Sequence, residues 1–295
     1  MRTVALVTCQ NLPDWEVDDH PLWKSLKDLG IHVLHPIWND AHFDWSQCDV
    51  VIPRTTWDYQ QHADEFLQWM THVNQVSHLL NPLSVMQWNL DKHYLQSFAD
   101  HIPPTHWFAK GSTYTSEQLL ALCHQYGWQR AFLKPCIAAS SWGSLRFHAD
   151  TQGIETAVTH LNQWLSTHDM MMQPYFSGVE KQGEVSCIFF NHQFSHAVRK
   201  VPVAGDYRVQ DDYGACDYPW QPSEDVLQSC QHILNQLTHL YEAVLYARCD
   251  FLFNDQGQAH LIELELIEPS LFFRHDSSSP QRFAQAIVDY MGWKS

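Results

Sequence analysis

The segment from Leu261 to Pro269 is the sequence feature that most constrains the fold of this chain. Apolar and acidic residues alternate along it, which is the period-two pattern of a β-strand. Glu263 and Glu265 then lie on one face of the strand, with Cα atoms about 7 Å apart. If their flexible side chains converge to about 5 Å, the two carboxylates repel by roughly 3 kcal/mol at an effective dielectric constant near 20. The acidic face of this strand therefore requires positive charge over it.

A second strand is predicted just upstream, from Tyr246 to Phe253. The Asn-Asp-Gln-Gly segment 254–257 between the two strands has the composition of a hairpin turn. Pairing of the strands would bring Asp250 to Glu263 and Glu265, a set of oxygen ligands without thiol or imidazole. Such ligands suit Mg²⁺, which commonly binds a few carboxylates together with substrate phosphates. The alternative is an exposed hairpin face whose acidic side chains are solvated.

Length, charge and cysteine usage limit the class of protein. With 295 residues, the chain is long enough for two or three packed lobes. Its formal net charge of −16 argues against nucleic acid and anionic membranes as partners. No apolar run is long enough to cross a bilayer, and the apolar start of the chain is too short for a signal peptide. The eight cysteines are scattered without C-x-x-C or zinc-type spacing, so we expect reduced thiols and a cytoplasmic location. The sequence leaves the oligomeric state open, with a homo-oligomer as one alternative.

The N-terminal third has the pattern of a small parallel α/β unit. Strands are predicted at 3–9, 31–36 and 49–52. A helix is predicted at 20–29, between the first two strands. Ligands of such sheets gather beyond the carboxyl ends of the strands. Arg54 and Asp58 follow the third strand, so they are predicted to face a substrate; the alternative is that they pair with each other. Asp18 and Asp19 are weaker candidates, and we interpret them as solvated loop acids.

A lysine at a strand end marks a further candidate site. The predicted strand 131–135 carries Lys134 and runs into a loop of small residues, 136–144. The backbone of such a loop can approach a ligand closely and present amides and hydroxyls to phosphate oxygens. The loop lacks the G-x-x-x-x-G-K-[ST] pattern, so it is not a Walker loop. Alone it could be a plain turn, but beside a strand-end lysine it favours phosphate binding.

Two proline-containing segments divide the chain. Pro103 and Pro104 interrupt the helical pattern and mark a predicted lobe boundary. The apolar segment 169–176 contains Pro174, which disfavours a central strand and favours a linker. We therefore predict lobes that meet near these two positions.

The order of motifs resembles the ATP-grasp superfamily, with a glutathione-synthetase-like ATP-binding fold. Within that superfamily the chain resembles, essentially end to end, the bacterial group that contains the cycloserine-forming cyclo-ligase. The resemblance is carried by five segments: R-T-T-W-D-Y (54–59), N-P-x-x-V-x-x-W-N-x-D-K (81–92), S-H-A-V-R-K-V-P (195–202), G-D-Y-R-V-Q (205–210) and E-L-I-E-P-S (265–270). It implies an α/β fold in three parts: an N-terminal parallel α/β (pre-ATP-grasp) lobe at 1–102, a small ATP-grasp lobe at 103–176, and a C-terminal lobe with the Mg²⁺ site at 177–295.

The resemblance also implies residues for ATP. Lys92 and Lys134 would contact the α- and β-phosphates, and the loop with Ser140, Ser141 and Gly143 would cover them. Adenine would meet Gln173 and the backbone of Tyr175 and Phe176, and the ribose hydroxyls would donate to Glu184. The loop has a single glycine, Gly143, where many relatives have several.

The same resemblance implies how the reaction would proceed. Asp250, Glu263 and Glu265 would hold two Mg²⁺ ions, with Glu265 standing where glutathione synthetases place Asn. Lys200 and Arg208 would neutralise charge on the γ-phosphoryl group and on an acyl phosphate made from it. The implied activity is ATP-dependent ligation of a small carboxylate, of an amino acid or peptide-like molecule, to an amine. A nucleotide-binding regulatory protein and an ATP-dependent kinase are the alternatives, and cyclisation is not distinguished from joining two molecules.

Overall fold

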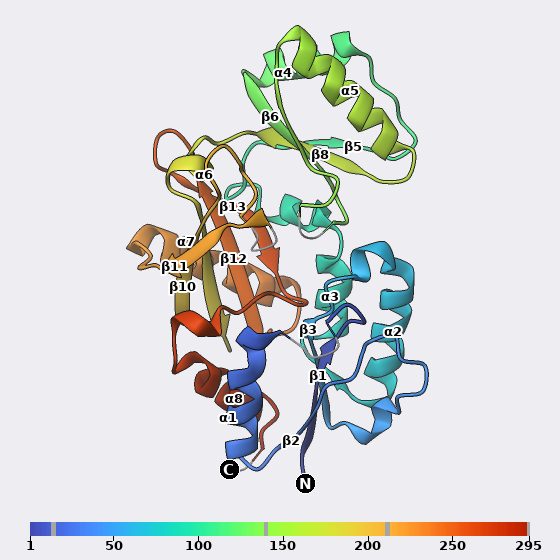
Figure 1. Cartoon of the computed structure of the whole chain (residues 1–295), viewed down its shortest axis with the longest axis vertical. Helices are drawn as coiled ribbons and strands as arrows, with labels where there is room; N and C mark the ends of the chain where they lie inside the picture. Colours follow the sequence, from blue (N-terminus) through green and yellow to red (C-terminus); the bar gives the residue numbers. More distant parts are fainter. Residues whose placement is uncertain (13–15, 139–140, 210–212, 294–295) are drawn as a thin grey trace.

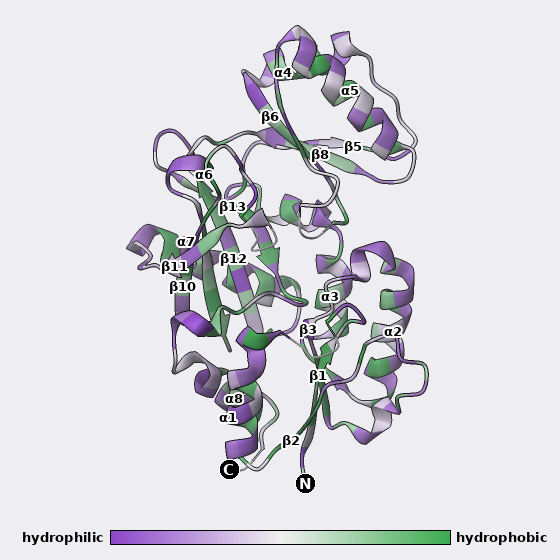
Figure 2. Ribbon diagram, in the orientation of Figure 1, coloured by the Kyte–Doolittle hydropathy of each residue, from purple (hydrophilic) through white to green (hydrophobic). Residues whose placement is uncertain are grey.

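Three β-sheets organise this computed structural model, which describes residues 1–12, 16–138, 141–209 and 213–293 (Figure 1). Hydrophobic residues run along strands such as β1, whereas helix α5 carries many hydrophilic residues (Figure 2). Among the described helices, none is long and apolar enough to cross a membrane.

The first sheet is the parallel unit that the sequence predicts. Its strand order is β2-β1-β3-β4, with all neighbours parallel. The strands are β1 (Thr3–Thr8), β2 (His32–Leu34), β3 (Val50–Thr55) and β4 (His78–Leu79). The helices of this region are α1 (His20–Asp28), α2 (Ala63–Val76) and α3 (Leu83–Asn89), with short 3₁₀ turns η1 (Val17–Asp19), η2 (Trp45–Gln47), η3 (Tyr59–Gln61) and η4 (Lys92–Phe98).

The second sheet is antiparallel, in the order β5-β8-β6-β7, with two helices on one face (Figure 1). Its elements are β5 (His106–Phe108), α4 (Ser116–Tyr126), β6 (Arg130–Pro135), β7 (Leu145–His148), α5 (Thr151–Leu165) and β8 (Met170–Pro174). The linker interpretation of 169–176 is wrong, because β8 pairs on both sides. Pro174 is tolerated since it is the last residue of the strand, where the ladder ends.

The third sheet carries the acidic hairpin. It is antiparallel, in the order β11-β10-β9-β12-β13. Its elements are α6 (Gly178–Lys181), β9 (Glu184–Phe190), β10 (Gln193–Val201), β11 (Cys216–Pro219), α7 (Glu224–Leu240), β12 (Tyr246–Phe253), β13 (Ala259–Glu265), η6 (Phe273–His275) and α8 (Ser279–Tyr290). The predicted hairpin is confirmed, because β12 and β13 pair with Asp250 directly opposite Glu263.

Packing joins the two ends of the chain. Helix α8 contacts α1, and the two helices share a buried core with β1 and β9. The three sheets lie within the ranges 1–102, 103–176 and 177–295, which we propose as the lobes of the protein. The contact between α1 and α8 holds the first of these ranges against the last.

Candidate active site

A cavity of about 350 Å³ is lined by residues of the second and third sheets and by segments of the N-terminal unit outside its strands, among them Trp57 and Tyr59 after β3. This is the size of a small-ligand pocket. Most of the predicted site residues line it: Lys92, Lys134, Ser141, Gln173, Tyr175, Phe176, Glu184, Lys200, Asp250, Glu263 and Glu265. Among the described residues, Arg54, Asp58, Gly143 and Arg208 do not line the cavity. Ser140 lies outside the described residues.

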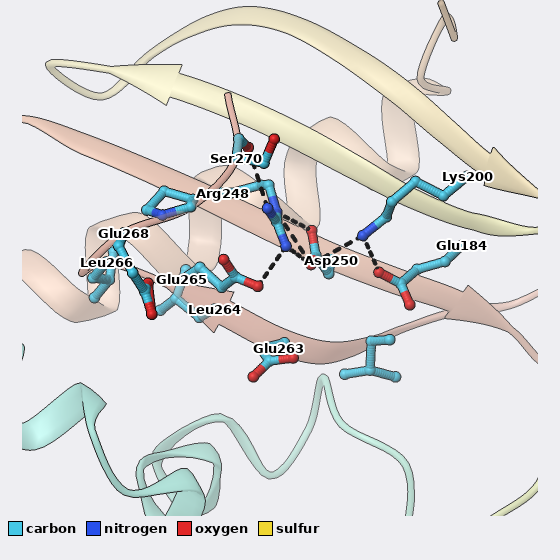
Figure 3. Close-up of polar contacts among 12 residues, drawn as sticks. Glu184, Lys200, Arg248, Asp250, Glu263, Leu264, Glu265, Leu266, Glu268 and Ser270 are labelled. Atoms are coloured by element: carbon cyan, nitrogen blue, oxygen red, sulfur yellow. Dashed lines mark hydrogen bonds and ion pairs between the residues drawn. The ribbon is translucent and has the colours of Figure 1, made fainter. Parts of the chain in front are cut away.

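The acidic face of the hairpin points into this cavity and not into open solvent. Asp250 is 1% exposed, and the side chains of Glu263 and Glu265 are 30% and 24% exposed. Figure 3 shows the three carboxylates on neighbouring strands, together with Glu184 and Glu268. The alternative of a solvated hairpin face is therefore wrong.

The protein's own cations supply the positive charge that the acidic face requires. Arg248 lies two residues before Asp250 on the same face of β12, and it bonds both Asp250, at 2.7 Å, and Glu265 (Figure 3). Lys200 pairs with Glu184 and lies 3.5 Å from Asp250. Sequence reasoning missed Arg248, although a charged residue at period two from Asp250 within an apolar strand could have signalled it.

These cations do not neutralise the carboxylates equally. Burial would raise the pKa of Asp250, but Arg248 and Lys200 hold it at about 2. Burial raises the pKa of Glu265 to about 8, because the charges of Asp250 and Glu263 add to the effect and outweigh Arg248. In the metal-free protein, the positive charge of Arg248 is thus insufficient to stabilise the carboxylate form of Glu265.

This cluster fits Mg²⁺. Its donors are all carboxylate oxygens, they line a cavity beside two lysines, and a divalent cation would reverse the unfavourable environment of Glu265. Asp250, Glu263 and Glu265 would be the ligands. Bound Mg²⁺ would supply positive charge against phosphate oxygens.

Lys92 and Lys134 lie at the junction between the second sheet and β13. Lys92 is the first residue of η4, and its Nζ lies 2.8 Å from Glu263 Oε1 and 2.5 Å from the Ala138 carbonyl oxygen. Lys134, near the end of β6, has a long contact of 3.4 Å to the Ile262 carbonyl oxygen. Burial lowers the pKa of Lys134, so its charged form lacks sufficient negative partners. A phosphate group would provide them.

Replacing Lys134 by Met is expected to weaken Mg·ATP binding by about 1.5–3 kcal/mol, the value of a hydrogen bond to a charged group. The protein without nucleotide should be as stable as the parent, because a poorly paired buried charge is removed. Isothermal titration with Mg·ATP measures the affinity, and Lys110→Met, on an exposed residue of the same lobe, is the control. Unchanged affinity in folded Lys134→Met would refute the phosphate role.

The predicted adenine and ribose residues all line the cavity, and three of their side chains bond protein groups. Gln173 Nε2 donates to Thr105 Oγ1 at 2.9 Å, and the Tyr175 hydroxyl donates to Glu180 at 2.6 Å. Glu184, the predicted ribose acceptor, pairs with Lys200. These three contacts fix the side chains at the cavity wall, and their nucleotide roles stay predictions.

Gly143 has a packing reason for being glycine. Its φ is +69°, and a Cβ atom there would lie 2.6 Å from the Trp164 ring and 2.8 Å from Pro135 Cγ. A side chain would therefore clash as well as strain the backbone. The position sets the path of the loop and is not itself at the cavity wall.

Arg54 pairs with Asp19, whereas the sequence predicts either a substrate or Asp58 as its partner. Its side chain is completely buried and binds Asp19 through two nitrogens, at 2.9 and 3.2 Å, and the Pro269 carbonyl oxygen at 3.0 Å. Asp58 instead accepts a hydrogen bond from Trp38 Nε1 at 2.7 Å. The pairing of Arg54 with Asp58 is therefore wrong, and neither side chain reaches the cavity.

The interpretation of Asp18 and Asp19 as solvated loop acids is also wrong, because both are buried. Asp19 holds Arg54, and Asp18 accepts from the Arg274 backbone nitrogen at 2.8 Å. The two acids thus attach the N-terminal sheet to the segment that follows the acidic hairpin.

Arg208 lies away from the predicted reaction centre in this structure. Its guanidinium binds Asp206 at 2.7 Å and lies over the ring of Tyr213, 3.9 Å from the ring centroid. Gln210, the last residue of the same motif, lies outside the described residues. A role of Arg208 at the phosphate would require it to exchange Asp206 for the substrate.

The cavity contains a group of residues to which sequence reasoning gave no role. Glu268 is 7% exposed, accepts a hydrogen bond from the Tyr59 hydroxyl, and has a pKa that burial raises. Trp57 Nε1 donates to the Glu268 carbonyl oxygen at 3.1 Å. Ser270 and Arg274 also line the cavity. Both Glu268 and Ser270 belong to the E-L-I-E-P-S motif, which is the signal that could have identified them.

Comparison with known proteins agrees with this fold. The sequence family described as D-cycloserine synthetase DcsG, N-terminal domain, matches residues 4–81. The cycloserine biosynthesis protein DcsG of Streptomyces lavendulae is 27% identical over 98% of this chain and 99% of its own length. The crystal structure of D-cycloserine synthetase DcsG superposes with a TM-score of 0.89 at 26% identity, covering 98% of this chain and 99% of that one.

More distant structures share the fold. D-alanyl-alanine synthetase A from Vibrio cholerae has a TM-score of 0.71 at 13% identity, over 98% of this chain and 96% of that one. The ATP-grasp ligase PsnB, solved with Mg and ADP, has a TM-score of 0.65 at 13% identity, over 97% of each chain. The chain therefore has the fold of the ATP-grasp ligases. In sequence and in structure it is similar over 98% of its length to D-cycloserine synthetase.

Proposed function

We propose that this chain uses ATP and Mg²⁺ to convert the carboxylate of an amino acid or small peptide-like molecule into an acyl phosphate. An amine of the same or a second molecule then displaces the phosphate and forms an amide-type C–N bond. The observation that carries this proposal is one cavity in which buried lysines, an acidic hairpin and Arg248 meet Trp57 and Tyr59 from the segment after β3. Catalysis in such a site needs positioning and charge neutralisation more than proton transfer.

The residues divide into three groups along the cavity. Lys92 and Lys134, with the loop at Ser141, would bind the phosphates, and Gln173, Tyr175, Phe176 and Glu184 would bind adenosine. Asp250, Glu263 and Glu265 would hold two Mg²⁺ ions. Lys200 and Arg248 already contact Asp250, so they are placed to neutralise the transferred phosphoryl group. Arg208 would join them from its position on Asp206.

The part of the cavity lined by Trp57 and Tyr59, in the segment after β3, is the proposed substrate end. Glu268 has carboxylate oxygens that can accept more hydrogen bonds than Tyr59 supplies, and it lies in a buried wall. An ammonium group would satisfy them. Arg54 and Asp19 would act there only indirectly, by holding the Pro269 carbonyl and hence the segment that carries Glu268 and Ser270.

Replacing Glu268 by Gln is expected to lower kcat/KM for an amine-containing substrate by roughly 10- to 100-fold, the loss of one charge-assisted hydrogen bond. The dissociation constant of Mg·ATP should stay unchanged, because Glu268 bonds Tyr59 and Trp57 of the N-terminal lobe. ADP release measures the first quantity and calorimetry the second, with exposed Glu117→Gln as the control. A loss of ATP affinity equal to the loss of kcat/KM would contradict the assignment.

The deciding experiment is a screen of amino acids and small carboxylates for ADP release, with and without an added amine. Release of inorganic phosphate with ADP supports the ligase. A stable phosphorylated product without free phosphate indicates a kinase. Nucleotide binding without turnover on any substrate would indicate a regulatory protein.

The eight cysteines support a reducing location for this reaction. All are free thiols, and seven of them are buried. Intracellular thiols remain reduced, whereas exported proteins commonly form disulfides. We propose that the enzyme works in the cytoplasm on small-molecule carboxylate and amine substrates.

A further inference from the structure

A second group of possible metal ligands lies outside the cavity. The ligand atoms of Asp91, His93 and Cys136 all lie within 4.8 Å of one another. Asp91 and His93 flank Lys92 at the start of η4, and Cys136 directly follows β6. The Lys92 backbone nitrogen donates to the Cys136 carbonyl oxygen at 2.8 Å, which brings the two segments together. Among the residues that the structure describes, this is the one mixed carboxylate, imidazole and thiol cluster of such compactness.

Each member of the cluster is held in place by a separate contact. The Asp91 carboxylate accepts from the His93 backbone nitrogen at 2.9 Å and lies 2.7 Å from His93 Nδ1. The His93 ring stacks on Trp107, with centroids 4.7 Å apart and planes at 27°. The Cys136 backbone nitrogen donates to the Asp169 carbonyl oxygen at 2.9 Å. The three side chains therefore need little rearrangement to bind one metal ion.

The donor set identifies the kind of cation. Thiolate, imidazole and carboxylate are the ligands of Zn²⁺, with bonds of about 2.3 Å to sulfur and about 2.0–2.2 Å to nitrogen and oxygen. At tetrahedral angles these bonds place the ligand atoms about 3.3–3.7 Å apart. Ligand atoms that lie within 4.8 Å of one another therefore need to move by about 1 Å to bind one ion. Mg²⁺ prefers oxygen ligands and octahedral geometry, so the cluster differs in chemistry from the acidic hairpin.

We propose that Asp91, His93 and Cys136 form a binding site for Zn²⁺ or a similar borderline-soft divalent cation, with water as the fourth ligand. The ion would enter from the side of Asp91 and His93, whose side chains are 39% and 35% exposed, while Cys136 closes the buried side. None of the three side chains lines the cavity. The nearby positive charges of Lys92 and Lys134 oppose the ion, but Lys92 is paired with Glu263.

Such a site would connect the two predicted phosphate lysines. An ion bound across Asp91, His93 and Cys136 would fix the start of η4, with Lys92, to the end of β6, with Lys134. Its occupancy would therefore alter the affinity for Mg·ATP. This makes the site regulatory, and its existence does not depend on the ligase reaction.

The test is a titration of the full-length, metal-stripped protein with Co²⁺ and then Zn²⁺, without nucleotide. We expect one tetrahedral Co²⁺ per chain with a thiolate-to-cobalt charge-transfer band, and displacement of the cobalt by Zn²⁺. Cys136→Ser should abolish the band, and His93→Gln should weaken binding by at least about 10-fold. Cys216→Ser, on the exposed cysteine, is the matched control and should leave both unchanged.

Three outcomes would overturn the proposal: no stoichiometric binding by the parent, a charge-transfer band that persists in Cys136→Ser, or a band lost in Cys216→Ser. Circular dichroism verifies folding of each variant, and His93→Gln keeps the test decisive if Cys136→Ser is unfolded. In the parent, Zn²⁺ should change the Mg·ATP dissociation constant by several-fold, and the change should disappear in His93→Gln. Because the cobalt titration uses neither ATP nor substrate, failure of the proposed ligase activity would not affect it.

Discussion

Replacing Glu265 by Gln is expected to lower turnover by about 10³-fold, the scale of losing an electrostatic group at the reaction centre. The same change should leave the protein without Mg²⁺ and ATP as stable as the parent or slightly more stable. Burial and like charges raise the pKa of Glu265 to about 8, so its carboxylate form is unfavourable until a cation binds. Arg248 keeps Asp250 and the Ser270 carbonyl oxygen as partners after the change.

Glu265 is a better probe of the metal site than its neighbour Glu263. Glu263 pairs with buried Lys92 at 2.8 Å, and that pairing with Lys134 nearby lowers the pKa of Glu263 against the effect of burial. Glu263→Gln would leave a buried lysine without its charge partner and so destabilise the metal-free protein as well. From the sequence alone, replacing Glu263 by Gln is predicted to relieve charge repulsion in the metal-free protein. The structure shows that this relief is expected at Glu265, because Glu263 is paired with Lys92.

Thermal unfolding of parent and Glu265→Gln, each with and without Mg·ATP, measures the effect on stability, and ADP release measures turnover. The Mg·ATP-dependent rise in Tm should shrink or disappear in the variant. Exposed Glu155→Gln is the control and should behave as the parent. If Glu265→Gln kept its full Mg·ATP shift and its turnover, the acidic strand would be scaffold and not a metal site.

Replacing Arg54 by Ala is expected to lower the free energy of unfolding by about 3–5 kcal/mol, the cost of breaking a buried ion pair. Arg54 is fully buried, and its removal leaves Asp19 without a partner in a site where burial already raises the pKa of that carboxyl group. The Pro269 carbonyl oxygen also loses its donor. The segment carrying Glu268 would lose its support, so turnover should fall together with stability.

Urea denaturation provides the measurement, with exposed Arg199→Ala as the control that should change stability by less than about 0.5 kcal/mol. Asp19→Asn should destabilise the protein in the same direction, since it removes the other half of the pair. A loss below about 1 kcal/mol in Arg54→Ala would mean that the pair is not the support inferred here. Under conditions where the variant is folded, Mg·ATP binding should persist, because Arg54 lies outside the cavity.

The sequence by itself determined the features that depend on neighbours along the chain. Period-two alternation and a four-residue turn place Asp250 opposite Glu263, because both signals act within about twenty residues. Strand and helix periodicity likewise predicts the parallel N-terminal sheet, and a lysine near a strand end predicts Lys134 at the cavity. The order of these local motifs was sufficient to indicate the ATP-grasp fold and the residues that bind ATP and Mg²⁺ in it, whose roles here remain predictions.

Only the tertiary structure decided which charges meet. Arg54 binds Asp19 from 35 residues away and Pro269 from 215, and Lys92 in η4 binds Glu263 on β13. Scattered cysteine spacing gave no sign of a soft-metal site, yet folding gathers Asp91, His93 and Cys136. Periodicity specifies which face of an element is buried, but not which distant element covers it. The partner of a buried charge is therefore fixed by packing, where an unpaired charge costs several kcal/mol and permits few alternatives.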